Sequence, residues 1–288
     1  MKQLAGYDLH THSTASDGSL EPRALVNAAY DAGVRVLALT DHDTLAGLSA
    51  ARQTADKLEG MVFVDGVELT CLWQTRVIHL LGLGIDPEFS GFAEYMQVLT
   101  TLRDERAEKI AEKLVKKGLP DLLAEARAIA GDGQIGRPHF AQAMLNRKMV
   151  STAQQAFDMW LGQGKAGDVK ATWPSLEKAV GLVKQSGGYA IVAHPTKYKF
   201  TFTRLRALVE DLLAAGGDGV EVSFPGVTPN HLRDLLLLAQ RKALWVSAGS
   251  DFHSPEQRWT SLGRFPQFQS PKHIVERLMP DGMAGRLA

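Results

Sequence analysis

The chain lacks several features that would direct it to a particular environment. Among its 288 residues there is a single cysteine, Cys71, so no disulfide forms within the chain, and we interpret the thiol as a reduced core residue. Basic and acidic residues are balanced at 32 each, which excludes an overall field that would attract long nucleic acids or an acidic membrane. No signal-type start and no run of about 18 apolar residues is present, so we expect a cytoplasmic protein without membrane contact.

What the sequence does contain is an alternation of short apolar runs with amphipathic segments, which is typical of βα units around a parallel sheet. Seven runs are expected as strands, at residues 6–12, 34–43, 61–69, 77–85, 189–195, 218–224 and 243–253. Many of these runs end in histidine or aspartate. The pattern predicts an α/β fold with one strand fewer than a regular eight-stranded barrel.

The alternation stops between roughly Glu88 and Lys170, where the patterns are helical and no convincing strand is found. We therefore predict a barrel domain built from residues 1–87 and 171–288, with a helical insertion at 88–170. The mixed charge run at 103–109 is interpreted as the solvated face of a helix.

Ligand-type side chains are concentrated in the first strand, in the stretch "YDLHTHSTASDG" at 7–18. Side chains alternate along a strand, so Asp8, His10 and His12 project to one face, where the two imidazoles can reach one ion. A lone histidine in a strand would more often be a hydrogen-bonded core residue. The paired spacing favours a metal site.

The same residue types recur where other predicted strands end, and in a βα barrel those ends converge at one mouth. The full candidate set contains six histidines and three carboxylates: His10, His12, Asp17, His42, Glu68, His79, His194, Asp251 and His253. That number exceeds what one ion can use, so two or three metal ions are predicted.

In this order, the motifs "DLHTHSTASDGSLEP", "ALTDHDTLAGL", "GVELT", "AHP" and "SDFH" resemble those of the PHP (polymerase and histidinol phosphatase) family of metal-dependent phosphoesterases. The resemblance covers most of the chain outside the insertion. It implies a distorted seven-stranded, TIM-like (β/α)7 barrel of the amidohydrolase-like group. Within the family, the chain is most similar to the branch of nucleoside 3′,5′-bisphosphate phosphatases and a 5′-end-trimming exoribonuclease.

The resemblance also implies how the ligands are shared among three ions. One set would be His10, His12, Glu68 and Asp251; a second Glu68, His79 and His194; and a third Asp17, His42 and His253. Glu68 would bridge two ions, and Asp251 or His194 would protonate the leaving oxygen. Asp8 and Asp41 are expected to orient ligand histidines, and Asp43 to cap a helix. The ligand types suit Mn²⁺, Fe²⁺ or Zn²⁺, and the resemblance favours Mn²⁺.

The insertion carries a local excess of positive charge between Gln134 and Lys170. "QIGRPHF" closes a glycine-rich loop and opens a helix, where backbone NH groups and a guanidinium can together hold a phosphate. We therefore predict Arg137 and His139 as contacts to a second phosphate, with Lys165 as a further substrate contact. The alternative is that Arg137 and His139 only cap and solvate the helix.

These features predict a phosphatase that removes one phosphate from a small nucleotide, with a nucleoside 3′,5′-bisphosphate as the preferred substrate and a 5′-mononucleotide as the product. The alternative is a 5′–3′ exonuclease on short RNA or DNA, since a neutral chain is poorly suited to long nucleic acids. A non-catalytic module and an amidohydrolase acting on C–N bonds are less favoured. Protein partners are left open.

Overall fold

The computed structural model describes residues 6–131 and 133–279, and its centre is a seven-stranded barrel. The strands are β1 (Tyr7–Asp8), β2 (Val36–Leu39), β3 (Val62–Trp73), β4 (Arg76–Leu83), β5 (Tyr189–Val192), β6 (Gly219–Ser223) and β7 (Trp245–Ala248). They are hydrogen-bonded in sequence order from β1 to β7. Backbone bonds from Leu9 N to Ala248 O (3.2 Å) and from Asp251 N to His10 O (2.8 Å) draw the two edges together. The seven predicted strands and the barrel are confirmed.

One strand runs against the predicted direction. β4 is antiparallel to both β3 and β5, whereas the other neighbouring pairs are parallel. The expectation of a wholly parallel sheet was therefore wrong. Only two residues separate Trp73 from Arg76, and a connection this short makes a hairpin, because a parallel crossover needs about a dozen residues. His79 consequently reaches the mouth of the barrel from the first half of its strand.

Helices cover the outside of the barrel: α1 (Pro22–Asp31), α2 (Leu48–Ala55), α7 (Leu176–Gln185), α8 (Phe202–Ala214), α9 (Pro229–Lys242) and α10 (Val275–Leu278). A short 3-10 helix, η2 (Pro195–Tyr198), follows β5. The apolar side chains form one core between strands and helices, around Leu37, Leu69 and Val180, and another among residues such as Val36, Leu81 and Ile191. These two layers fix the direction in which each strand end points.

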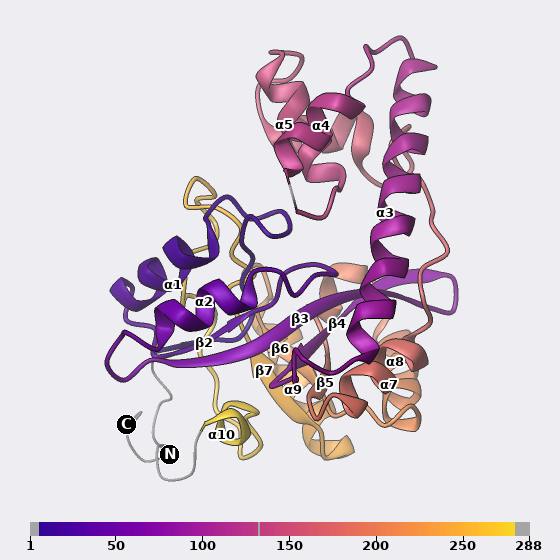
Figure 1. The fold of residues 1–288 in the computed structure, drawn as a ribbon. Helices are drawn as coiled ribbons and strands as arrows, with labels where there is room; N and C mark the ends of the chain where they lie inside the picture. Colours follow the sequence, from indigo (N-terminus) through magenta and orange to yellow (C-terminus); the bar gives the residue numbers. More distant parts are fainter. Residues whose placement is uncertain (1–5, 132, 280–288) are drawn as a thin grey trace.

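Between β4 and α7, the elements that the structure describes are helices: α3 (Gly91–Val115), α4 (Leu123–Ala130), α5 (Arg137–Asn146), α6 (Ala153–Ala156) and the π-helical segment η1 (Phe157–Leu161). Figure 1 shows α3 leading away from the barrel to α4 and α5. Residues from Ala107 to Val169 form a separate apolar core, while Phe92 and Leu99 of α3 pack in the barrel core. The helix α3 thus belongs to both parts, and the predicted boundaries at 88 and 170 stay a prediction. We call residues 88–170 the helical subdomain.

In the described ranges, no helix combines the length and apolar character that crossing a bilayer requires.

Candidate metal centre

The strand ends bring the predicted ligand residues together although they are up to 243 positions apart in the sequence. Three overlapping groups have donor atoms within 4.8 Å of one another: His10, His12, Glu68 and Asp251; His12, Asp17, His42 and His253; and His42, Glu68 and His79. His194 joins them through its Nε2, 3.0 Å from Glu68 Oε1. All nine predicted positions therefore lie in one cluster at the barrel mouth.

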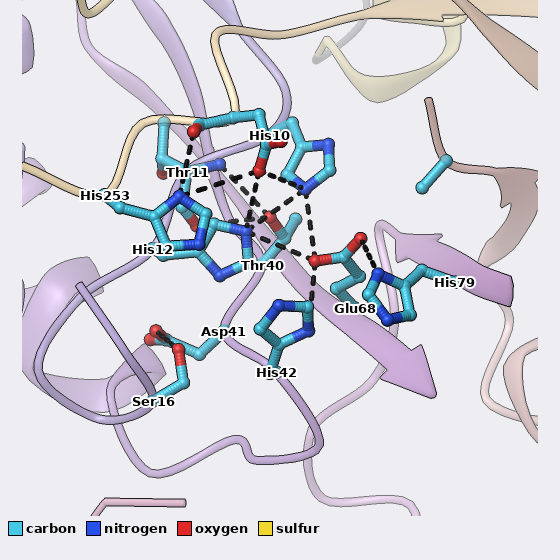
Figure 2. A network of polar contacts seen from close by, with 12 residues as sticks. His10, Thr11, His12, Ser16, Thr40, Asp41, His42, Glu68, His79 and His253 are labelled. Carbon is cyan, nitrogen blue, oxygen red and sulfur yellow. Dashed lines mark hydrogen bonds and ion pairs between the residues drawn. The ribbon is translucent and has the colours of Figure 1, made fainter. Parts of the chain in front are cut away.

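Glu68 occupies the middle of this cluster on β3. Its Oε1 lies 3.0 Å from His79 Nδ1 and from His194 Nε2. Its Oε2 lies 3.3 Å from His10 Nε2, 3.2 Å from His12 Nε2 and 3.1 Å from His42 Nδ1. Figure 2 shows the imidazoles of His10, His12, His42 and His79 arranged around the carboxylate. The two oxygens thus face different sets of histidines, as a carboxylate shared between ions would.

Several polar atoms of the cluster are buried but have no hydrogen-bond partner among the described residues. They are Glu68 Oε2 and the Nδ1 atoms of His12, His42, His79 and His194. Buried polar atoms are normally paired, so this many unpaired donors and acceptors in one place needs an explanation. Cations coordinated by imidazole and carboxylate would satisfy them, and the donor set therefore fits divalent metal ions.

The ionisation of the two central carboxylates is suited to cations. Burial opposes the charged form of Glu68, but the surrounding imidazoles outweigh burial and hold the pKa of Glu68 well below its usual range. The pKa of Asp251 is likewise held low against burial, by His10 and Lys197. Burial lowers the pKa of His42 to about 3, so this imidazole is neutral and free to coordinate.

A carboxylate behind the cluster orients two of the histidines. Glu221 on β6 is fully buried, with its Oε1 3.0 Å from His10 Nδ1, and its Oε2 accepts the backbone NH of His194 at 2.6 Å. Such outer carboxylates fix the ring orientation of metal-binding imidazoles. Glu221 was not among the predicted site residues. A charged residue inside the otherwise apolar run "DGVEVSF" was the available signal.

Asp8 and Asp41, expected to orient ligand histidines, instead hold backbone and hydroxyl groups. Asp8 accepts the NH groups of His10 (3.3 Å), Ser250 (2.8 Å) and Gly263 (2.8 Å). Asp41 accepts from Ser13 N (2.7 Å), and from the hydroxyls of Ser13 and Ser16 (2.6 Å each). Both carboxylates fix the loops that carry ligand residues, and neither contacts an imidazole.

Asp43 does not cap a helix, since the residue that precedes α2 is Gly47. It is fully buried, accepts the NH of Thr70 at 2.6 Å, and forms an ion pair with Arg103, whose Nε lies 2.8 Å from Oδ2. Arg103 comes from α3 and is 9% exposed, so interpreting 103–109 as a solvated face was wrong for this residue. The pair fastens α3 to the loop that carries His42.

The predicted substrate contacts lie in the helical subdomain, outside the three donor groups. His139 is buried, and its Nδ1 accepts the NH of Gly136 at 2.9 Å at the start of α5, which is the capping role that we gave as the alternative. Arg137 is half-buried and donates from Nη1 to Leu161 O at 3.1 Å. Lys165 is exposed in a turn.

The start of α5 nevertheless lies close to the barrel mouth. Gln134 N donates to Ala15 O at 3.3 Å, and a Cβ on Gly133 would lie 2.7 Å from Thr14 O, so only glycine permits this approach. Burial lowers the pKa of His139, and the charge of Asp17 opposes that shift. The helical subdomain thus meets the loop that carries Asp17.

Comparison with known proteins agrees with this architecture. Residues 8–220 match the PHP domain family. The chain is 43% identical over 258 residues to a 5′-3′ exoribonuclease of Haemophilus influenzae (90% of this chain, 93% of the relative), and 36% identical over 261 residues to a 3′,5′-nucleoside bisphosphate phosphatase of Chromobacterium violaceum (90% and 91%).

Two solved structures are similar in fold. One, an amidohydrolase of Chromobacterium violaceum with bound sulfate and no metal, has a TM-score of 0.89 at 34% identity over 95% of this chain and 96% of that one. The other, an inferred metal-dependent phosphoesterase of Bifidobacterium adolescentis, has a TM-score of 0.84 at 26% identity over 97% and 98%. The chain therefore belongs to the PHP domain family and is an enzyme of this group of phosphoesterases.

Proposed function

We propose that the nine clustered residues bind two or three divalent cations and that the enzyme hydrolyses phosphate esters of small nucleotides. The observation that carries this proposal is the set of buried imidazole and carboxylate atoms without partners around Glu68. One ion would be held by His10, His12, Glu68 and Asp251, a second by Glu68, His79 and His194, and a third by Asp17, His42 and His253. His12 and His42 each lie within reach of a further group.

Bound divalent ions would neutralise charge on the phosphoryl group and make water acidic enough to attack it near neutral pH. Mixed imidazole and carboxylate donors favour Mn²⁺, with Zn²⁺ or Fe²⁺ as alternatives, over an all-oxygen Mg²⁺ site.

The protein's own side chains orient the ligand histidines and supply the proton that the leaving oxygen takes up. Glu221 holds the ring of His10 and the backbone NH of His194 in place. Of the two groups predicted to protonate the leaving oxygen, Asp251 and His194, we propose His194, since its side chain is 8% exposed and the pKa of Asp251 is held too low for that carboxylate to carry a proton. Glu68 is assigned the bridging position.

The preferred substrate is a nucleoside 3′,5′-bisphosphate, with the cluster acting on one phosphate while the helical subdomain holds the other. Support comes from a concentration of guanidinium groups between α3 and α5. Burial and the charges of Arg137 and Arg103 lower the pKa of Arg106 to about 10, so the three groups lie close enough to repel one another. An anion placed among them would relieve that repulsion. Arg137 is the proposed contact, with His139 and Lys165 in supporting positions.

A 5′–3′ exonuclease acting on short oligonucleotides is the second candidate. The observation that favours it is the 43% identity to a relative named as an exoribonuclease. The same cluster would act on a diester in place of a monoester.

The two candidates are separated by their products. The Mn²⁺-loaded enzyme is incubated with adenosine 3′,5′-bisphosphate and with a 5′-phosphorylated dinucleotide, and inorganic phosphate and mononucleotides are quantified. A phosphatase releases phosphate from the bisphosphate, and an exonuclease releases mononucleotides from the dinucleotide. If neither product forms, both proposals are wrong.

A further inference from the structure

The long helix α3 carries its charges on separate faces. At about 100° per residue, Arg103, Arg106, Lys109 and Lys113 fall within an arc of about 120°, and Asp104, Glu105, Glu108 and Glu112 fall within a neighbouring arc of about 100°. Lys116 and Lys117 follow in the turn that ends the helix. Oppositely charged residues on a solvated helix usually alternate so that they pair along the helix. The segregation here leaves one side of the outer half of α3, with the turn after it, basic.

The two faces differ in what covers them. On the acidic face, Arg127 of α4 pairs with Glu108 at 3.1 Å and with Asp104 at 3.7 Å. On the basic face, Lys113, Lys116 and Lys117 are exposed and form no ion pair within the described residues, and Lys109 has only a solvent-exposed contact of 3.6 Å with Glu105. The basic face is therefore available to an anionic partner.

A groove runs along this face beside the segment that returns to the barrel. It has a volume of about 460 Å³ and is lined by Lys109, Glu112, Lys113, Lys116, Asp168, Val169 and Lys170. The returning segment then passes Arg106, whose Nε donates to Val169 O at 2.8 Å, and places the ring of Trp173 5.6 Å from the guanidinium of Arg103.

The groove leads to the barrel mouth. Arg103 is bonded to Asp43, the residue after His42, and Lys113 and Lys116 lie about 15 and 20 Å further along the helix axis at 1.5 Å per residue. Figure 1 shows α3 extending outward from the strands. Exposed lysines that continue outward along a helix fixed beside a phosphoesterase site match the repeating charge of a sugar–phosphate backbone.

We propose that the basic face of α3, with Lys170, binds the downstream phosphates of a single-stranded oligonucleotide whose 5′ end lies at the metal cluster. This rests on the exonuclease form of the proposed function, and it gives the enzyme a preference for substrates several nucleotides long. The chain as a whole is neutral because acidic residues elsewhere balance these lysines, so the net charge gives no sign of the groove.

The test compares a variant that neutralises the groove, Lys113→Gln with Lys116→Gln and Lys170→Gln, with a control that removes the same charge from exposed sites elsewhere, Lys57→Gln with Lys178→Gln and Arg241→Gln. For the Mn²⁺-loaded enzymes, kcat/KM is measured on a 5′-phosphorylated octaribonucleotide, on a 5′-phosphorylated dinucleotide and on adenosine 3′,5′-bisphosphate, over a range of KCl concentrations. A Lys→Arg version of the groove variant should behave as the wild type.

We expect wild type and control to prefer the octanucleotide over the dinucleotide by about tenfold or more, and the groove variant to lose that preference. The slope of log kcat/KM for the octanucleotide against log salt should become shallower by about 2, since each phosphate contact contributes about 0.7 for a single strand. Hydrolysis of the bisphosphate should be unchanged. If the preference for the octanucleotide is equal in all variants, or absent from the wild type, the proposal that the groove binds downstream phosphates is wrong, and the exonuclease proposal is unaffected. Failure to cleave either oligonucleotide overturns the exonuclease proposal and the groove with it.

Discussion

The barrel mouth and the helical subdomain treat polar groups in opposite ways. At the mouth, five imidazole or carboxylate atoms around Glu68 are buried without a hydrogen bond from the described residues. In the helical subdomain, exposed charges such as Arg127 and Arg147 are paired with acids from neighbouring helices. Unpaired buried polar groups destabilise a fold, so they persist where something else binds them. The difference indicates that the mouth is built for ligands and that most polar groups of the subdomain serve its own structure.

The strongest test of this contrast removes one ligand from the mouth. His42→Asn should lower phosphate release about a thousandfold or more, because His42 belongs to two of the three donor groups and a bound metal contributes several kcal/mol to catalysis. His231→Asn, which changes an exposed histidine of α9, is the matched control and should keep full activity. Both are assayed with Mn²⁺ after circular dichroism has established folding. A fully active His42→Asn enzyme would show that the third group is dispensable.

The second test concerns the buried ion pair between Arg103 and Asp43, which joins the two regions. Arg103→Met leaves the Asp43 carboxylate buried without its partner, which should reduce the free energy of unfolding by about 3–5 kcal/mol. Arg127→Met removes exposed ion pairs and should cost about 0–1 kcal/mol. Urea denaturation measures both. The double variant Arg103→Met with Asp43→Asn should recover part of the loss, and strictly additive effects would mean that the two side chains are not coupled.

Much of the fold and the mouth was predictable because the local pattern dictates the outcome. Apolar runs that end in His or Asp become strands, and convergence of strand ends brings the ligands together whatever their separation in the sequence. The direction of β4 was missed, although the seven residues between the strands predicted at 61–69 and 77–85 are too few for a parallel crossover.

Other features depend on three-dimensional partners that no local pattern contains. The run at 103–109 is as charged as a solvated helix face, and only the docking of α3 against the loop of Asp43 buries Arg103. Ser19 resembles a helix cap, yet α1 begins at Pro22 and Ser19 N donates to His253 O at 2.7 Å. Glu221 was missed because it stands in a mostly apolar run of the sequence. Each of these residues is determined by a contact with a distant part of the chain.

A third, smaller effect is expected from the carboxylate behind the ligands. Glu221→Gln keeps the shape of the side chain but weakens its hold on His10 and His194, so the Mn²⁺ concentration for half-maximal activity should rise about 10–100-fold. The measurement is a Mn²⁺ titration of activity in metal-stripped enzyme. Glu59→Gln on the exposed surface should leave the titration unchanged. If the titration of Glu221→Gln is unaltered, the carboxylate of Glu221 does not affect metal binding and serves only in packing.

The smallest effect tests whether the subdomain contributes to the site at all. Arg137→Ala should lower kcat/KM for adenosine 3′,5′-bisphosphate about tenfold, because a half-buried guanidinium that holds a phosphate contributes about 1.5 kcal/mol or more. Hydrolysis of an aryl phosphate, which has no second phosphate to hold, should change far less. Arg147→Ala, at the other end of α5 and paired with Glu125 on the surface, is the control and should affect neither substrate. Equal losses on both substrates would remove Arg137 from substrate recognition and leave it as a bond between α5 and Leu161. In that case the contrast between the two regions would be sharper, with the chemistry at the mouth and Arg137 engaged in the fold of the subdomain.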